Sequence, residues 1–230
     1  MLAPIDRSAV KCTKTILRLS CPAIVGLLII ASSFAEPLYF PVRENDSAPG
    51  VSQFEAEWYS RSLTLMHEPR LPEATEDSTL TIYRFTLLPT WGNPVVVRVQ
   101  RDSANYHLYL SRTDGQAGYY EGKLVEQKDI ELSDVDSKIL DSLVTRLSLL
   151  NMPSDEEILG FDGEQWILEG VKDGRYHVVV RWTVTYDTKE RDLGPFLTLC
   201  RYLIDMSPLS ETPKNKGHEI FPRNNKPTGR

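Results

Sequence analysis

Cysteine is scarce in this sequence. Three cysteines occur in 230 residues, and two of them, Cys12 and Cys21, lie before an apolar N-terminal segment. If that segment is removed during export, Cys200 is the single thiol that remains, so an internal disulfide is excluded and the domain depends on its hydrophobic core. Because Cys200 lies on the apolar side of a predicted helix, we expect it to be a buried structural thiol.

Recognised catalytic and cofactor motifs are missing too. The sequence has no GxSxG, P-loop, CxxC or EF-hand pattern. Its four histidines are His67, His107, His177 and His218. No two of them share a spacing typical of metal ligands, such as i, i+4. We therefore predict no metal site and no cofactor.

Excess positive charge is also lacking, and this excludes another class of protein. The chain has 26 Lys+Arg against 32 Asp+Glu, a net charge of -6, and a pI near 5.3. A nucleic-acid-binding protein that relies on bulk charge is basic, so we expect no nucleic-acid partner. With 41% hydrophobic and 25% charged residues, the composition is that of an ordinary globular chain. The length suits one domain.

The first 35 residues have the pattern of an export signal. A basic stretch precedes an uncharged run of 13 residues over 22–34, and Ser33 and Ala35 form a small-x-small site. Cleavage after Ala35 would leave 22 basic and 31 acidic residues, a net charge of -9, and would place the protein in the periplasm or outside the cell. A spanning helix needs about 20 apolar residues. The alternative is an uncleaved N-terminal anchor in the inner membrane, the one case in which we expect membrane contact.

The rest of the chain divides into a linker, a domain and a tail. Residues 36–53 contain Pro, Asn, Asp, Ser and Gly with few apolar residues, which is typical of a linker. Residues 54–207 carry the periodic hydrophobic patterns of one domain. Residues 208–230 are rich in proline and basic residues and are interpreted as a disordered basic tail.

Hydrophobic periodicity predicts three helices and six strands. Helical spacing occurs over 54–67, 133–152 and from 194 onward; strand alternation occurs over 80–88, 95–100, 105–111 and 119–131, and in a hairpin over 165–182. Short turns between neighbouring strands indicate antiparallel pairing. The predicted fold class is α+β, with a mainly antiparallel sheet of about six strands and three helices packed on one face. The other face is expected to be open.

The helix over 133–152 has the strongest pattern. Ser133 is a good N-cap. Val135, Ile139, Leu143 and Leu147 recur every four residues, as the buried stripe of a helix does. We expect this stripe to face the core, with Leu143 fully buried.

Four segments are distinctive as a set. They are YRFTLLPTWGNPVVVRV (83–99), GQAGYYEGKL (115–124), DGEQWILEGVKDGRYHVVVRW (162–182) and FLTLCRYLIDMS (196–207). Together they resemble a group of exported bacterial proteins that has no agreed activity. The resemblance spans about residues 60–206 and implies that the α+β domain is an established unit with both tails outside it. It carries over no catalytic residue, and it weakens after Trp182, where the group's proline-bearing turn is replaced by Thr183-Val184-Thr185.

The hairpin over 165–182 has a register that can be derived. A two-residue turn at Asp173-Gly174 places Trp166 opposite Arg181, with His177 on the same side. This side is the less apolar one, so we expect it to belong to the open face. The more apolar side is expected to face the helices.

The predicted open face therefore collects guanidinium and aromatic groups. Its members are Arg84, Arg98, His107, Tyr109, Trp166, His177 and Arg181. Of these, Arg84, Arg98, Trp166, His177 and Arg181 are the candidate ligand-binding residues. Guanidinium groups and stacking rings suit an anionic or carbohydrate ligand. The alternative is that the arginines cover apolar neighbours and pair with carboxylates.

Glu169 is the one acidic residue on the side expected to face the helices. Such a carboxylate is either hydrogen-bonded structurally or an acid with a perturbed pKa.

Three function classes remain open. The first is a non-enzymatic binding or interaction module of the bacterial envelope, whose partner would be an envelope protein or a small anionic ligand. The second is a hydrolase with an acid/base site near Glu169 or His177. The third is a purely structural module attached to the membrane.

Overall fold

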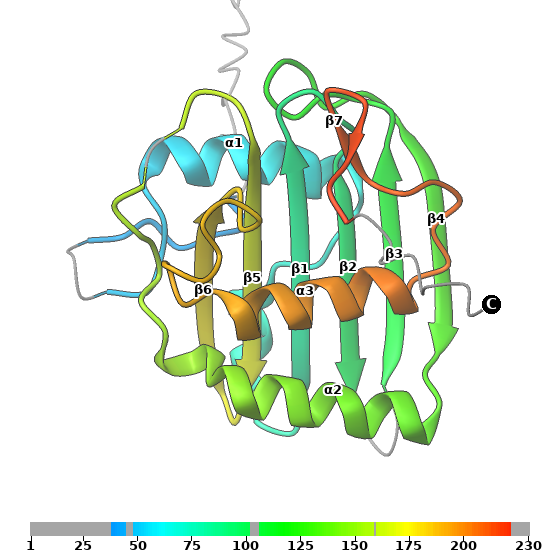
Figure 1. Ribbon diagram of the computed structural model, residues 1–230. Coiled ribbons are helices and arrows are strands. Elements are labelled where there is room, and N and C mark those ends of the chain that lie inside the picture. Colours follow the sequence, from blue (N-terminus) through cyan, green and yellow to red (C-terminus); the bar gives the residue numbers. More distant parts are fainter. Residues whose placement is uncertain (1–37, 45–47, 102–105, 159, 222–230) are drawn as a thin grey trace, which may run out of the picture. The chain divides into compact units, whose positions relative to one another are not determined.

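The computed structural model describes residues 38–44, 48–101, 106–158 and 160–221 (Figure 1). The predicted signal segment and its cleavage site at Ala35 lie outside the described residues. So do the last nine residues of the predicted tail.

The described chain forms a six-stranded antiparallel sheet with helices. The elements in order are α1 (Gln53–Leu65), the 3-10 helix η1 (Leu71–Glu76), β1 (Thr81–Pro89), β2 (Val95–Arg101), β3 (His107–Thr113), β4 (Leu124–Glu131), α2 (Asp134–Leu147), η2 (Leu149–Asn151), β5 (Glu164–Lys172), β6 (Arg175–Trp182), α3 (Gly194–Met206), β7 (Lys214–Asn215) and β8 (His218–Glu219). The sheet order is β4-β3-β2-β1-β5-β6, and β7 and β8 form a separate hairpin. The predicted α+β class and the antiparallel sheet are confirmed.

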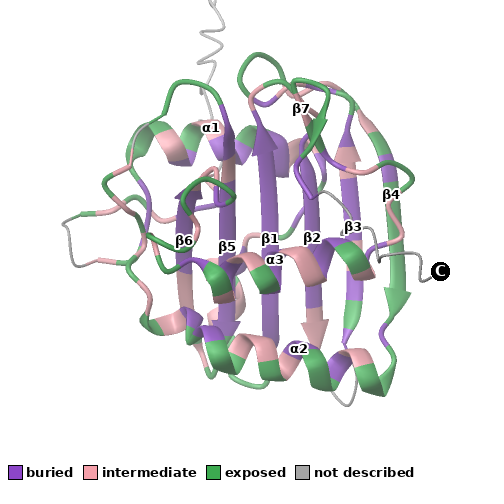
Figure 2. Cartoon of the chain, in the orientation of Figure 1, coloured by how far each residue is buried: buried purple, intermediate pink, exposed green. Residues whose placement is uncertain are grey.

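The helices are divided between the two faces of the sheet, which differs from the arrangement predicted. Helices α2 and α3 share a core with the side of β1 that contains Phe85 and Leu87. Helix α1 packs on the opposite face, where Tyr59 and Leu63 meet Ile167 (Figure 1). The physical reason is visible in β1, which is buried at all nine positions. A strand buried on both faces needs a layer on each side, so neither face is open. Figure 2 shows this burial along β1, β2 and β5 and the exposed edge strand β4.

Side-chain caps fix where two helices begin. The Ser52 hydroxyl accepts from the Glu55 backbone N–H at 3.3 Å, and the Glu55 carboxylate accepts from the Ser52 backbone N–H at 2.9 Å. This reciprocal pair is a capping box, which satisfies two donors at the start of α1. At α2, the Ser133 hydroxyl accepts from the Asp136 N–H at 3.1 Å, so the predicted N-cap is confirmed.

Helix α2 buries a different side from the one predicted. Leu140 is fully buried, whereas Leu143 is half-buried. Val135 and Ile139 are 66% and 40% exposed. The expectation that Leu143 is fully buried was therefore wrong. The four-residue stripe drifts around the helix because 3.6 residues complete a turn, and the first half of that stripe faces solvent.

The β5–β6 hairpin has the register derived from its turn. Asp173 and Gly174 have φ values of 52° and 68°, as a type I′ turn requires. Trp166 opposes Arg181, as predicted.

The chain on both sides of the predicted domain is part of the fold. Near the N-terminus, Phe40 is buried, and its ring meets that of Tyr59 edge-on at 5.8 Å. Near the C-terminus, Phe221 is buried against Trp166, with ring centroids 4.9 Å apart. The described parts of 36–53 and 208–230 are therefore neither a bare linker nor a disordered tail. Phe40 belongs to the core on the α1 face, and Phe221 belongs to the core on the α2/α3 face.

Cys200 lies in α3, in the core that α2 and α3 share. It is a free thiol with no exposed surface, and burial raises its pKa well above the usual value. The prediction of a buried structural thiol is confirmed.

Candidate functional site

The predicted binding residues do not share one face of the sheet. Arg84 pairs across the strands with Arg98 and with Glu169, so these three lie together under α1. Trp166 and Arg181 oppose each other on the face that α2 and α3 cover. The prediction of a common face was wrong. The predicted register within the hairpin was right. The prediction then assigned the more polar side of the hairpin and the more polar side of the other strands to the same face. These two sides lie on opposite faces of the sheet, because the polar side of β1 and β2 is buried under α1.

Arg84 is held in a buried ion pair. Its Nε and Nη2 donate to the two carboxylate oxygens of Glu169 at 2.6 and 2.8 Å, and Nη1 donates to the Pro69 carbonyl at 2.6 Å. The Tyr176 hydroxyl donates to Glu169 Oε1 at 3.0 Å. Neither Arg84 nor Glu169 has exposed surface. Burial alone would lower the pKa of Arg84, but the Glu169 carboxylate raises it above its ordinary value, so the arginine is a cation that binds a carboxylate.

Arg98 completes this cluster and is not available to a ligand either. Its Nε donates to Glu68 Oε2 at 2.8 Å, and its guanidinium lies 4.0 Å from the centroid of the Tyr109 ring. The same Glu68 oxygen lies 3.5 Å from Arg84 Nη1. His107 is exposed on this side of the sheet, at the end of β3. The charges under α1 thus satisfy one another.

The other three predicted residues, Trp166, His177 and Arg181, have structural contacts: Trp166 packs in the core, and the other two bond to the backbone next to strand β6. Trp166 has no exposed surface. His177 Nε2 donates to the Met152 carbonyl at 2.7 Å, and burial lowers the pKa of its imidazole. Arg181 Nη2 donates to the Pro153 carbonyl at 2.9 Å. His177 and Arg181 therefore fix residues 152–153 along the outer strand β6.

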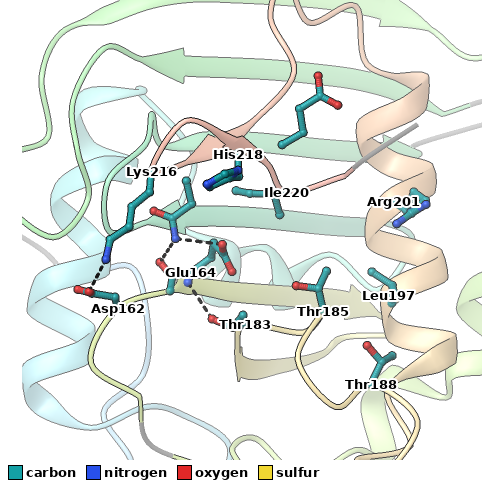
Figure 3. A pocket seen from close by; sticks show the side chains of 13 residues that line it. Asp162, Glu164, Thr183, Thr185, Thr188, Leu197, Arg201, Lys216, His218 and Ile220 are labelled. Carbon is teal, nitrogen blue, oxygen red and sulfur yellow. Dashed lines mark hydrogen bonds and ion pairs between the residues drawn. The ribbon is translucent and has the colours of Figure 1, made fainter. Parts of the chain in front are cut away.

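A cavity of about 630 Å³ lies at one end of the sheet, on the face covered by α3 (Figure 3). Its walls come from the ends of β5 and β6, the segment between β6 and α3, helix α3 and the β7–β8 hairpin. The lining includes Glu164, Thr183, Thr185, Leu197, Arg201 and Ile220. Three secondary-structure elements that are distant in sequence thus contribute polar groups to one space.

Glu164 is the unusual residue of this cavity, which we call the Glu164 cavity. Its side chain is 8% exposed. Asn215 Nδ2 donates to Oε1 at 3.1 Å, but Oε2 is buried and accepts no hydrogen bond from any described residue. Burying a carboxylate oxygen without a donor is costly, so such a group calls for an explanation. Figure 3 shows Glu164 together with Thr185, Leu197 and Ile220 among the residues that line the cavity.

The cavity also holds positive groups. Lys216 Nζ donates to Asp162 Oδ2 at 2.7 Å, so its charge is compensated. Arg201 lines the cavity from α3, and within the described part of the chain it has no ion-pair partner. The cavity therefore offers a carboxylate oxygen without a donor and a guanidinium without a counter-ion.

Comparisons with known proteins do not assign the chain to a family. No protein-family model matches it, and no curated protein matches it. The interpretation of the site therefore depends on its geometry.

The described residues set two limits on what the site can be. Within 38–44, 48–101, 106–158 and 160–221, no group of three or more His, Cys, Asp or Glu residues is placed to hold a metal ion. None of the helices in these ranges is long and apolar enough to cross a membrane.

Sequence reasoning missed the Glu164 cavity because one wall lies in the presumed tail. The β7–β8 hairpin turns at Lys216-Gly217, with φ values of 49° and 78°. Asn-Lys-Gly-His is a two-residue hairpin turn with glycine at its second position, a signal that was available in the sequence. Nothing in the sequence places Asn215 beside Glu164, since 51 residues separate them.

Proposed function

We propose that this chain is an exported, non-enzymatic binding protein of the bacterial envelope, and that the Glu164 cavity is its ligand site. The observation that carries the proposal is the buried Glu164 Oε2, which lacks a donor beside a cavity large enough for a small molecule. Oε2 has almost no accessible surface in its present position, so the Glu164 side chain must turn towards the cavity before a ligand N–H or O–H group can supply the missing hydrogen bond.

The charges of the lining suggest the class of ligand. A purely anionic ligand, as expected from the sequence, would be repelled by Glu164. The ligand proposed here therefore also carries a cationic group. An ammonium suits Glu164, and a carboxylate suits Arg201, because charge-assisted hydrogen bonds are the strong ones. A free amino acid or a short peptide carries both groups. We therefore propose a zwitterionic ligand of this kind.

The hydrolase hypothesis has less support from the geometry. Glu169 is fully buried and both its oxygens are bonded to Arg84 or Tyr176. His177 lies on the opposite face of the sheet and donates to a backbone carbonyl. An acid and a base that act together must both reach the substrate. The proposal therefore assigns no catalytic role to either residue.

Export is the part of the proposal that rests on sequence alone. The basic stretch, the short apolar run and the Ser33-x-Ala35 site support a signal peptide, and hence a periplasmic or secreted protein. Sequencing the N-terminus of protein purified from the periplasm tests this, and a start at Glu36 is expected. A start at Met1 in the membrane fraction would favour the anchor.

The ligand proposal is tested by thermal unfolding of the purified protein with free L-amino acids and dipeptides. A ligand that binds only the folded state stabilises it by about 2.7 kcal/mol at a concentration of 100 Kd. At least one compound is expected to raise the melting temperature. Its N-acetylated form lacks the ammonium, and its C-amidated form lacks the carboxylate. Both are expected to bind more weakly.

Two variants and one control locate the site. Glu164→Gln should abolish discrimination against the N-acetylated compound, and Arg201→Gln should abolish discrimination against the amidated one. Asp129→Asn, at an exposed position on the distant strand β4, should leave both unchanged. The proposal would be contradicted if no compound raised the melting temperature, or if each compound raised it equally in the wild type and all three variants. The remaining functions would then be a structural module or a module that binds another protein.

A further inference from the structure

Exposed aromatic side chains gather at one place on the surface. Of the described residues, six aromatic ones are exposed: Phe54, Trp91, Tyr119, Tyr120, Phe161 and Tyr186. Three of these, Phe54, Tyr119 and Phe161, line a single groove of about 380 Å³, and Trp91 packs against Tyr119 with ring centroids 4.6 Å apart and ring planes tilted by 41°. Exposed apolar patches of this kind mark places where something binds.

The rings come from elements that are well separated in the sequence. Phe54 lies in the first turn of α1, Tyr119 in the turn between β3 and β4, and Phe161 in the segment before β5. Trp58 lines the same groove; its Nε1 donates to the Ala117 carbonyl at 2.7 Å, and its ring lies 6.0 Å from that of Phe54. The hydrogen bond fixes the Trp58 ring in place, so the groove has a rigid aromatic base.

The groove also has charged groups. Glu57, Arg61 and Glu121 line the same groove. Arg61 lies 3.7 Å from Glu121, and its side chain is largely exposed. These groups can donate to and accept from hydroxyls at the edge of a ligand whose flat side lies on the rings.

The chemistry of the groove favours one class of occupant. A purely apolar partner would desolvate the carboxylates of Glu57 and Glu121, which is costly even though Gln53 donates to Glu57 and Arg61 lies 3.7 Å from Glu121. An anionic lipid surface would be repelled, because the groove has three carboxylates, from Glu57, Glu121 and Asp162, and one arginine. A sugar ring has an apolar C–H face and a rim of hydroxyls, and it satisfies both kinds of group.

We propose that this aromatic groove binds an uncharged oligosaccharide. The proposal does not depend on the Glu164 cavity, with which the groove shares only Asp162. Sugar rings stack on Phe54 and Tyr119, and hydroxyls bond to Glu57, Arg61 and Glu121.

The test is a binding titration of the purified full chain with two uncharged probes, cellohexaose and fully N-acetylated chitohexaose, monitored by calorimetry and tryptophan fluorescence. At least one probe is expected to bind and to change the emission, since Trp58 lies in the groove. Phe54→Ala and Tyr119→Ala should each weaken binding roughly tenfold, the size expected for one aromatic contact plus its buried area. Both side chains are exposed, at 71% and 60%, so the fold should be unaffected.

Tyr186→Ala is the matched control, because this tyrosine is 54% exposed and lies outside the groove. It should leave the affinity for the probe unchanged. Absence of binding to both probes would overturn the proposal, as would equal weakening by all three variants. Binding to vesicles of anionic phosphatidylglycerol that Phe54→Ala and Tyr119→Ala abolish would also overturn it, in favour of a membrane contact.

Discussion

Under α2 and α3 the centre of the sheet is apolar, whereas under α1 the corresponding strands carry opposite charges. Phe85 and Leu168 pair on the first face and have no exposed surface. One residue earlier in β1 and one later in β5, Arg84 pairs with Glu169 on the second face, with Arg98 beside them. Both faces are closed, but the centre of the first is held by apolar packing, whereas the second combines an apolar cluster beneath α1 with a set of paired charges.

This difference has a consequence for stability. An apolar core loses free energy in proportion to the volume removed. A buried ion pair contributes little by comparison with apolar residues of the same size, yet removing one partner leaves a buried charge uncompensated. The α1 face should therefore be less tolerant of single substitutions than the α2/α3 face and more tolerant of paired ones.

The largest effect is expected for Glu169→Gln. This change keeps the size of the side chain and removes the charge that Arg84 contacts through two hydrogen bonds. The free energy of unfolding should fall by about 3–5 kcal/mol, as for other buried pairs that lose one partner. Urea unfolding followed by circular dichroism measures it.

The paired control replaces both charges at once. Arg84→Met combined with Glu169→Leu should restore most of the lost stability, because apolar residues of similar volume replace a buried pair at little cost. A double variant as unstable as Glu169→Gln alone would show that the cluster is needed for more than mutual compensation.

On the α2/α3 face the expected effect depends on volume. Leu140→Ala should cost about 2–5 kcal/mol, because Leu140 is fully buried in that core. Ile139→Ala, one residue away and 40% exposed, should cost less than about 1 kcal/mol. Leu140→Met should cost less than about 1.5 kcal/mol, since it conserves volume. Equal losses for Leu140→Ala and Ile139→Ala in urea unfolding would mean that the buried face of α2 is misassigned.

Local patterns predicted the elements well. The strands β1, β2 and β3, both hairpin strands and all three helices have boundaries close to those predicted, because periodicity, Ser133 and the Asp173-Gly174 turn are all local signals. A turn also fixes the register of the strands that it joins, which is why Trp166 and Arg181 were paired correctly.

The assignment of faces failed because it depends on long-range pairing. Arg84 and Arg98 made one side of their strands look solvated, whereas Glu169 and Glu68 compensate them in the core. A charge on a strand has the same sequence pattern whether water or a counter-ion satisfies it. The Glu164 cavity was beyond reach for a related reason, since its walls meet only after the chain beyond α3 has folded back.

Two buried glutamates, one on each face of the sheet, have pKa values that are shifted in opposite directions. Burial raises the pKa of Glu169, although Arg84 and Tyr176 oppose the shift. At the edge of the α2/α3 face, burial acts in the same direction on Glu126. There, hydrogen bonds from Lys128, Ser210 and Arg112 outweigh it and lower the pKa to about 2. Glu126 therefore stays ionised, and it ties the segment after α3 to the sheet.

Among the three charge-removing or core-truncating changes, Glu169→Gln, Leu140→Ala and Glu126→Gln, the last is expected to have the smallest effect, and it has a defined pH dependence. The folded pKa of Glu126 is about 2 and lies below its ordinary value of 4.5. Its stabilisation is therefore fully present above about pH 4.5 and is lost as the pH falls towards 2. At pH 7 the variant should be less stable by about 1.5–3 kcal/mol, the range for hydrogen bonds to a charged group. In urea unfolding at a series of pH values, this difference should shrink below pH 4.5, whereas Asp129→Asn should match the wild type throughout. A difference that stays constant down to pH 3 would mean that the shape of the side chain, and not its charge, holds Ser210 to the sheet.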